Sequence, residues 1–288
     1  MMATAHDECG SVMPYITVGW ENTADIRIYY EDHGSGPPVV LVHGYLADGR
    51  SWEKQETALL AAGYRVISYD RRGGGFSGRP SVGYDYDTLT ADLNALLEEL
   101  DLRQAVLVGC GSGTGEVMRY LGTNGPRRVR AAALLAPLPP LLAAEQRDGS
   151  DWDFLDEFLG QLRTDRPAAV KTYLDRYYNM DLLGGTFVSE QAWQNSFQAA
   201  VRVSAVAAQG CAEAWREDFR ADLARITVPV LIVRAAQDRV MPLSASRNCL
   251  SVMRNNARFI TIPSGPHAVI WTHAAAVNRA LLDFLRAL

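Results

Sequence analysis

The sequence predicts an α/β protein, with a mostly parallel, twisted sheet of about eight strands, helices on both faces and a helical insertion. Short apolar runs alternate with helical segments along most of the chain, as in a parallel sheet that is covered on both sides. The length of 288 residues and the apolar fraction of 48% suit one large domain. The alternation stops between residues 138 and 225, where only helical patterns occur.

The expected elements follow in chain order. Two β-rich runs separated by a polar turn predict an N-terminal hairpin. Continuous apolar runs predict buried strands, and leucines at helical spacing between residues 89 and 100 predict a helix. The expected strands are residues 16–20, 26–30, 38–42, 64–70, 105–108, 129–135, 228–233 and 258–262. The expected helices are residues 51–62, 89–100, a segment from 114, 152–162, 170–178, 189–215, 245–253 and 273–288.

The helical insertion divides the chain into two predicted parts. Residues 1–137 and 226–288 carry the strand–helix alternation and form the expected core domain. Residues 138–225 contain amphipathic helices rich in aromatic side chains, and they form the expected helical cap. Ligands of open α/β sheets bind beyond the carboxyl ends of the strands, so this cap is expected to cover that edge.

Composition excludes several classes of protein. A net charge of −5 argues against a nucleic-acid partner. The polar N-terminus is unlike a signal peptide, and no apolar stretch is long enough to span a membrane, so we expect a cytoplasmic protein without a membrane partner. The four cysteines are scattered without metal-ligand spacing, which predicts reduced thiols and no metal site. We also expect no cofactor. The expected partner is a small-molecule substrate.

Residues 109–113 read Gly-Cys-Gly-Ser-Gly between an expected strand and an expected helix. The Gly-x-Ser-x-Gly turn of many enzymes carries a nucleophilic serine at its centre, but here the centre is Gly111, a vacated nucleophile position. Ser112 is the nearest hydroxyl, and we expect it to contribute its backbone N–H to an anion site at the helix start. Catalysis by its hydroxyl is the alternative, although Thr114 would then crowd the bend. Cys110 is expected to face away from the site.

Three further segments lie at the ends of expected strands. His43 and Gly44 precede Tyr45, whose backbone N–H is a second candidate oxyanion donor. Asp238 follows the strand at 228–233, and His267 follows the last strand. Turn, acid and histidine stand in the chain order of a nucleophile–acid–histidine triad, so we expect Asp238 to orient His267 as a catalytic base. The candidate pocket residues are His43, Tyr45, Trp152, Tyr177, Trp193 and Trp271.

Several segments together resemble one enzyme family, the cofactor-free haloperoxidase (perhydrolase, esterase) branch of the α/β-hydrolases. They are residues 43–45, 51–55, 69–73 with Ser77, 83–87, 113–117 and 271–273. The resemblance runs from about Ile16 to the C-terminus. It implies the α/β-hydrolase fold, oxyanion N–H groups on Tyr45 and on the residue after the centre of the turn, and a homo-oligomer, either a dimer or a trimer.

The departures from the family pattern concern the expected pocket. The resemblance places the family's serine at Gly111 and its usual methionine at Ser112. In the segment Arg72-Gly73-Gly74-Gly75, a glycine stands where the family has an aromatic residue. Several changes near the pocket are what adaptation to another reaction would leave. The serine-to-glycine change taken alone would also fit an engineered knockout. Esterase and perhydrolase chemistry need the missing side-chain oxygen for an acyl-enzyme.

We therefore expect non-hydrolytic acid/base catalysis on a small, oxygenated, partly apolar metabolite. Proton abstraction, elimination, cyclisation, isomerisation or cofactor-free oxygenation would each use a histidine base that faces an oxyanion site. Two alternatives remain. One is an ester or lactone hydrolase that uses Ser112 or a water activated by His267. The other is a non-catalytic protein that binds a small molecule.

Overall fold

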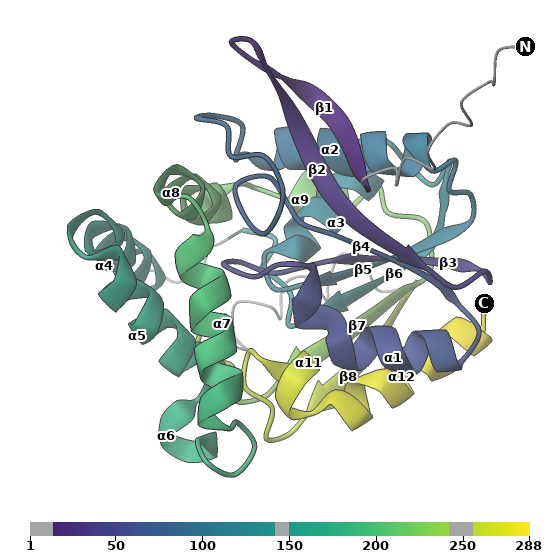
Figure 1. Cartoon of the computed structure of the whole chain (residues 1–288). Coiled ribbons are helices and arrows are strands. Elements are labelled where there is room, and N and C mark those ends of the chain that lie inside the picture. The colour runs from purple at the N-terminus through teal and green to yellow at the C-terminus, as the bar shows by residue number, and fades with distance from the viewer. Residues whose placement is uncertain (1–13, 142–149, 242–255) are drawn as a thin grey trace, which may run out of the picture.

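The computed structural model describes residues 14–141, 150–241 and 256–288. In these residues an eight-stranded sheet has the order β1-β2-β4-β3-β5-β6-β7-β8 (Figure 1). β1, β2 and β4 pair antiparallel, and all other neighbours pair parallel, which confirms the predicted sheet. The strands are β1 (Tyr15–Glu21), β2 (Ala24–His33), β3 (Pro38–Val42), β4 (Arg65–Tyr69), β5 (Ala105–Cys110), β6 (Val129–Leu135), β7 (Val230–Ala235) and β8 (Ala257–Ile262).

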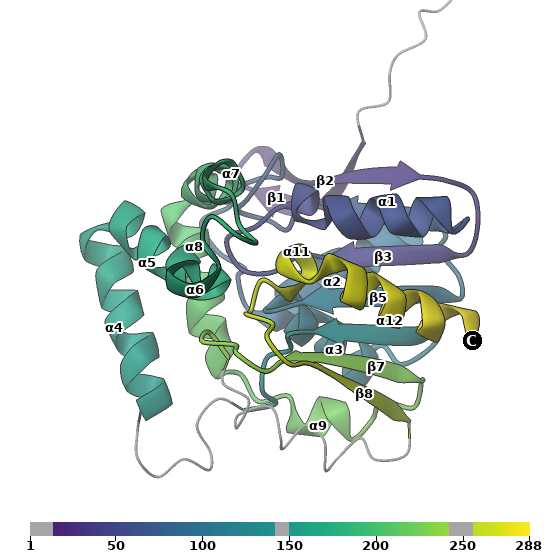
Figure 2. The same ribbon diagram turned by 90° about the horizontal axis from the view of Figure 1, so that it is seen from below.

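Helices cover both faces of the sheet, as the strand–helix alternation predicts. Figures 1 and 2 show α1 and α12 on one face and α2 and α3 on the other. The helices are α1 (Glu53–Ala61), α2 (Tyr86–Glu99), α3 (Gly113–Thr123), α4 (Ser150–Thr164), α5 (Arg166–Tyr178), α6 (Met180–Leu183), α7 (Glu190–Arg202), α8 (Ala205–Glu213), α9 (Arg220–Leu223), α11 (Val269–Thr272) and α12 (Ala274–Arg286).

The central strands feed two separate apolar cores, because successive side chains of a strand point to opposite faces. In β3, Val39 and Leu41 belong to the core under α1 and α12, whereas Val40 and Val42 belong to the core under α2 and α3. All four side chains are fully buried. This double burial explains why the strand reads as a continuous apolar run rather than an alternating one.

Helices α4–α8, which we call the inserted helices, lie between β6 and β7 in the chain and beyond one end of the sheet (Figure 1). They contact loops that follow the parallel strands. The Tyr45 ring, after β3, packs against Phe158 of α4 and Tyr173 of α5, with ring centroids 6.0 and 5.3 Å apart. The Ala268 N–H, after β8, donates to the Tyr177 carbonyl at 2.9 Å. The inserted helices therefore pack on the carboxyl edge of the sheet.

Some predicted boundaries differ from the structure. The helix expected over residues 189–215 is divided into α7, α8 and a short 3₁₀ turn. The chain is extended at Val203, and the Ser204 hydroxyl accepts the Ala207 N–H to start a new helix, as an N-cap serine does. β7 begins at Val230 rather than at residue 228, after Pro229, which has no N–H to donate. The helix expected over residues 245–253 lies outside the described residues.

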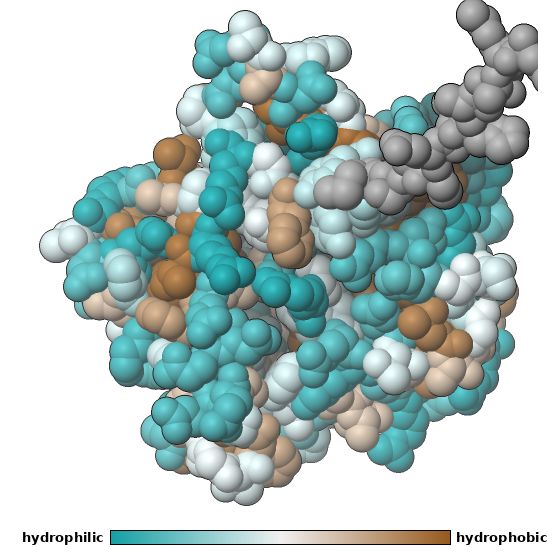
Figure 3. All heavy atoms as spheres, viewed as in Figure 1, coloured by the Kyte–Doolittle hydropathy of each residue, from teal (hydrophilic) through white to brown (hydrophobic). Residues whose placement is uncertain are grey.

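The described surface is mixed in polarity. On the face seen in Figure 3, hydrophilic side chains cover most of the area, and apolar residues lie scattered between them. Among the described residues, no helix combines the length and the apolar character that crossing a membrane requires.

Candidate active site

The turn between β5 and α3 brings the chain close to several backbones. Gly111, at its centre, has a φ of +53°, in the left-handed region that disfavours side chains. A Cβ atom on Gly109 would lie 2.7 Å from the Gly113 carbonyl oxygen, and one on Gly113 would lie 2.3 Å from that of Val42. Because backbone atoms cannot move aside cheaply, glycine is required at both flanking positions. Steric crowding by neighbouring backbones thus explains why the sequence motif has glycine at both flanking positions.

Asp238 and His267 form a buried hydrogen-bonded pair at the carboxyl ends of β7 and β8. The Nδ1 atom of His267 lies 2.7 Å from Oδ2 of Asp238, and their side chains are 3% and 4% exposed. The other carboxylate oxygen accepts the N–H groups of Val240 and Met241 at 2.9 and 2.7 Å. An ionised Asp238 has no proton to donate, so it fixes the proton of His267 on Nδ1. The Nε2 atom is then an acceptor, as a general base needs.

The imidazole of His267 stands directly over the glycine at the centre of the turn. A Cβ atom on Gly111 would lie only 2.8 Å from Nε2 of His267, and its next neighbour beyond the ring would be the Gly44 Cα at 3.9 Å. A side chain at this position would therefore touch the basic nitrogen of His267 immediately. Since Gly111 has none, this nitrogen faces the backbone at the centre of the turn.

The two expected oxyanion donors lie on adjacent loops. A Cβ atom on Gly44 would be 3.2 Å from the carbonyl oxygen of Cys110, so the loop after β3 packs on the turn after β5. The backbone N–H groups of Tyr45 and Ser112 form no hydrogen bond with another residue in the described parts of the chain. Leu46, which follows Tyr45, has a φ of +55°, a strained conformation of the kind found at functional sites.

The Ser112 hydroxyl has a cationic partner. Its oxygen accepts a hydrogen bond from Nη1 of Arg71 at 3.0 Å, and the residue is 3% exposed. The described hydrogen bond of His267 is with Asp238 instead. A serine acts as a nucleophile when a base accepts its proton, which a guanidinium cannot do.

Cys110 lies on β5 below the turn, in the core under α1 and α12, as expected from the sequence. Burial, together with the charge of Asp238, raises the pKa of the Cys110 thiol from 9.0 to about 12. The thiol is therefore protonated at neutral pH, and protonated thiols are poor nucleophiles.

His43 has both ring nitrogens engaged. Nε2 accepts the backbone N–H of Arg71 at 2.9 Å, which leaves Nδ1 to donate to the Gly44 carbonyl oxygen at 2.8 Å. Burial, helped by the Arg71 charge, lowers the pKa of His43 from 6.5 to about 4. His43 is therefore neutral and holds the loop that carries Tyr45.

A buried ionic network lies behind the turn. Nε of Arg71 is 2.9 Å from Oε2 of Glu116, and the Tyr69 hydroxyl donates to the other oxygen of Glu116. Burial raises the pKa of Glu116 from 4.5 to about 7, although Arg71 opposes this shift. Sequence reasoning missed this network, because Arg71 read only as part of a short basic pair. The nearest signal was that Arg71 and Glu116 both fall in segments that resemble the family.

A cavity near the site has a volume of about 610 Å³, including its open mouth. It lies between the inserted helices and the loops after β3 and β8. Its lining includes Tyr45, Tyr173, Tyr177, Tyr178, Ile270 and Trp271. The Tyr177 ring also contacts the His267 ring edge-on, with centroids 5.4 Å apart. Tyr177 therefore stands between the cavity and the buried dyad.

The predicted pocket residues are divided among several places. Tyr45, Tyr177 and Trp271 line the cavity. His43 instead lines a smaller cavity of about 300 Å³ on the other side of the Tyr45 loop. Trp193 is outside both linings and stacks on Phe197, with centroids 5.2 Å apart. Trp152 falls within α4, but its side chain is outside the described part of the structure.

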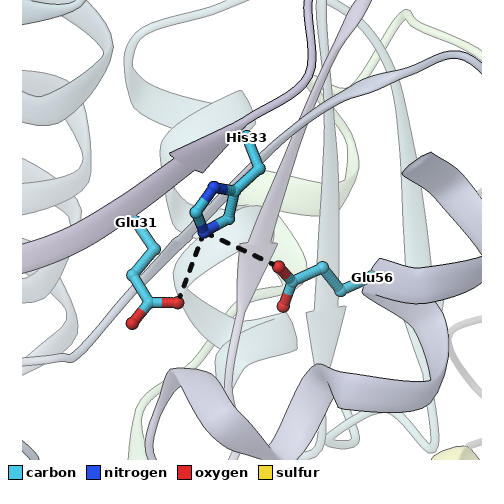
Figure 4. Close-up of side chains that lie close together, drawn as sticks. All are labelled: Glu31, His33 and Glu56. Atoms are coloured by element: carbon cyan, nitrogen blue, oxygen red, sulfur yellow. Dashed lines mark ion pairs between the residues drawn. The ribbon is translucent and has the colours of Figure 1, made fainter.

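One group of potential metal ligands occurs in the described residues. Nε2 of His33 lies 3.7 Å from Glu31 and 3.9 Å from Glu56, on β2 and α1 (Figure 4). His33 pairs with Val66 near the amino end of β4, so the cluster is remote from the carboxyl edge and the dyad. Sequence spacing could not show it, because a strand and a helix contribute its members. His33 is 52% exposed, and we assign the cluster no part in the reaction.

Comparison with known proteins shows the family. Residues 37–274 match the family model described as the alpha/beta hydrolase fold. The chain therefore belongs to the α/β-hydrolase family.

Individual relatives show which members of this family the chain resembles. The chain is 49% identical over 276 residues to a Synechocystis sp. protein named "Putative non-heme chloroperoxidase", covering 95% of this chain and 100% of the relative. It is 36% identical over 279 residues to the non-heme chloroperoxidase of Streptomyces lividans, covering 93% and 100%. The crystal structure of bromoperoxidase from Bacillus anthracis superposes with a TM-score of 0.88 at 38% identity, covering 94% and 99%. The expected kinship with non-heme haloperoxidases is thus confirmed.

Proposed function

We propose that this protein is an enzyme in which His267 acts as a general base, without a covalent intermediate at position 111. The observation that carries the proposal is the placement of Nε2 of His267 directly over Gly111, 2.8 Å from where a side chain would begin. In the neutral imidazole, Asp238 holds the proton on Nδ1 and leaves Nε2 as the acceptor, and Gly111 offers no oxygen for it to activate. The base is therefore free to act on the substrate itself.

The reaction begins with transfer of a proton from a C–H or O–H bond of the substrate to Nε2 of His267. The electron pair of that bond stays on the substrate as an enolate or alkoxide. The N–H groups of Tyr45 and Ser112 stabilise this anion, and Asp238 stabilises the imidazolium. Proton abstraction, elimination, cyclisation, isomerisation and cofactor-independent oxygenation all share this first step, so the proposal covers this group of reactions.

The cavity supports a small, oxygenated and partly apolar substrate. Aromatic rings line it, and polar groups such as Asp48, Arg50 and Asn195 are also part of its wall. We propose that residues 138–225 act as a lid over the core domain, formed by residues 1–137 and 226–288. Since His267 is only 2% exposed, the Tyr177 ring and the inserted helices must move to admit a substrate.

Two alternatives receive unequal support. Hydrolysis by a water bound to Nε2 of His267 uses the same geometry, and it remains the second candidate. Hydrolysis through Ser112 is disfavoured, because its hydroxyl is bound to Arg71. A non-catalytic binding protein would have no need for the Asp238–His267 pair, so an intact dyad argues against that function.

The test uses an alkyl fluorophosphonate, which forms a covalent bond with an activated serine. We expect the wild type to remain unlabelled and Gly111→Ser to become labelled. The His267 ring must shift slightly in this variant, because the new Cβ atom would otherwise lie 2.8 Å from its Nε2. His267→Ala in the Gly111→Ser background is the control and should abolish labelling. Labelling of the wild type that Ser112→Ala removes would overturn the proposal in favour of a serine hydrolase.

A second measurement tests catalysis by the natural site. A strain that lacks the gene is complemented with wild type or with His267→Ala, and the small-molecule products are compared by mass spectrometry. Loss of a product with His267→Ala is expected. An identical product profile would contradict the general base.

A further inference from the structure

The anion site depends on two N–H groups from segments that are far apart in the chain. Tyr45 lies on the loop after β3, and Ser112 lies at the start of α3. Donors that stabilise an oxyanion must lie within about 2.7–3.1 Å of the same oxygen atom. Something must therefore hold these two segments in a fixed relation.

Arg71, on the loop after β4, is bonded to both segments. Its backbone N–H donates to Nε2 of His43 at 2.9 Å, and His43 donates in turn to the Gly44 carbonyl, next to Tyr45. Its guanidinium donates through Nη1 to the Ser112 hydroxyl at 3.0 Å. One residue thus connects the loop of the first donor with the turn of the second.

The guanidinium of Arg71 is itself held in place. Its Nε lies 2.9 Å from Glu116, which belongs to the first turn of α3 and is fully buried. The Tyr69 hydroxyl donates to Glu116, which restricts the carboxylate further. Arg71 is only 5% exposed. A planar guanidinium with several donors can satisfy a carboxylate and a hydroxyl together, which a lysine ammonium does with less directional control.

We propose that Arg71 is a positioning residue for the anion site. Arg71 holds the N–H groups of Tyr45 and Ser112 at the spacing that one substrate oxyanion requires. This inference rests on the proposed function, because it concerns the same site. It also gives Ser112 a role, in which the hydroxyl anchors the residue so that its N–H faces the substrate.

Arg72 provides a matched control. It is as buried as its neighbour, with 6% exposure, and forms a buried ion pair with Asp92 through Nε and Nη2, both at 2.6 Å. These described hydrogen bonds go to α2 rather than to the turn or to His43. Arg71→Met and Arg72→Met therefore each remove a buried ion pair, but only Arg71→Met releases the turn.

The kinetic test measures phosphonylation of Gly111→Ser by the fluorophosphonate, since charge develops on the phosphoryl oxygen during this reaction. Removal of one oxyanion donor slows catalysis roughly 10²–10³-fold, and a displaced donor should cost less. We expect Arg71→Met to lower the maximal labelling rate roughly 10- to 100-fold, with the half-saturating probe concentration little changed. Arg71→Lys should lie in between, and Arg72→Met should remain close to the parent. Equal rates for Arg71→Met and Arg72→Met would overturn the inference.

Ser112→Ala is the milder variant, for use if Arg71→Met fails to fold. It removes one hydrogen bond and keeps the Arg71–Glu116 pair. We expect roughly 3- to 10-fold slower labelling, a fraction of the loss of a whole donor. An unchanged rate would contradict the positioning role.

A crystallographic comparison decides the inference independently of labelling. The distance between the Tyr45 and Ser112 backbone nitrogens should change by more than about 0.5 Å in Arg71→Met and stay constant in Arg72→Met, in a wild-type Gly111 background. An unchanged distance in Arg71→Met would overturn the positioning role. If Gly111→Ser is never labelled, the proposed function fails, while this distance still decides the role of Arg71.

Discussion

The turn at residues 109–113 has two sides, which are equally buried but differ in how their polar groups are used. On the side of Arg71, the guanidinium and the carboxylate of Glu116 are engaged with each other and with neighbouring hydroxyls. On the side of His267, one imidazole nitrogen is bound to Asp238, and the other faces a glycine. Among the described residues this second nitrogen has no hydrogen-bond partner, so it is available to accept a proton from a substrate.

The two sides of the turn therefore have different roles, one structural and one chemical. The ion pair and hydrogen bonds on the Arg71 side connect the turn to its neighbours, but none of these groups is among the atoms nearest to a Cβ at Gly111. An unused basic nitrogen above an unused anion site is what proton transfer requires. Under the proposed function, a glycine at position 111 therefore narrows the chemistry of the α/β-hydrolase site without disabling it.

The largest expected effect follows from Asp238→Asn. The Asn oxygen can keep the N–H groups of Val240 and Met241, so its NH₂ group would face Nδ1 of His267. Nδ1 then becomes the acceptor and Nε2 carries the proton, which removes the base. In Ser-His-Asp enzymes this change costs about 10⁴-fold in rate. We expect roughly 10³- to 10⁴-fold slower fluorophosphonate labelling of Gly111→Ser, measured by timed in-gel fluorescence.

Asp70→Asn is the control for this prediction. Asp70 also accepts two backbone N–H groups, from Gly49 and Phe76, but in the described part of the chain none of its hydrogen bonds involves a histidine. Its replacement should leave the labelling rate close to that of the parent. An equal loss of rate in both variants would show that the dyad is not the base.

The sequence predicted one side of the turn much better than the other. Asp238 and His267 could be found because their chain order and their position after strands carry a recognisable pattern. The Arg71–Glu116 pair carries no such pattern, since it forms between a loop and a helix that only the fold brings together. Aromatic residues behave similarly, because Tyr177 and Trp193 read alike in a helix, yet only Tyr177 reaches the cavity and His267. Which face of a helix meets a site depends on packing rather than on composition.

A second prediction compares two glycines of the turn. In Gly113→Ala the new methyl group would lie 2.3 Å from the Val42 carbonyl oxygen, so the free energy of unfolding should fall by about 3 kcal/mol or more. In Gly111→Ala the methyl group meets the movable His267 ring, and a left-handed φ adds about 1–2 kcal/mol. Urea denaturation measures both. Gly125→Ala, with a φ of +68° and no atom within 4 Å, isolates the cost of the φ angle alone. A smaller loss in Gly113→Ala than in Gly125→Ala would contradict the close packing of the turn.

The smallest expected effect is a pH dependence of stability that comes from Glu116. Its pKa is about 7 in the folded protein and 4.5 as a free carboxyl group. Between these pH values the folded state binds more protons than the unfolded state, so the unfolding free energy falls as the pH rises. The slope is at most about 1.4 kcal/mol per pH unit for one group. His43 acts in the opposite direction, since its pKa of about 4 lies below the ordinary value of 6.5.

Glu116→Gln separates these two contributions, because the variant keeps His43 and resembles the protonated carboxyl group. We expect wild type and variant to have similar stability near pH 4.5 and to diverge toward pH 7, where the ionised Glu116 makes the wild type the less stable of the two. Urea denaturation at four or five pH values measures the difference. A difference that does not vary with pH would mean that the Arg71 charge holds the pKa of Glu116 at its ordinary value, so that the Arg71 side of the turn is a permanent ion pair.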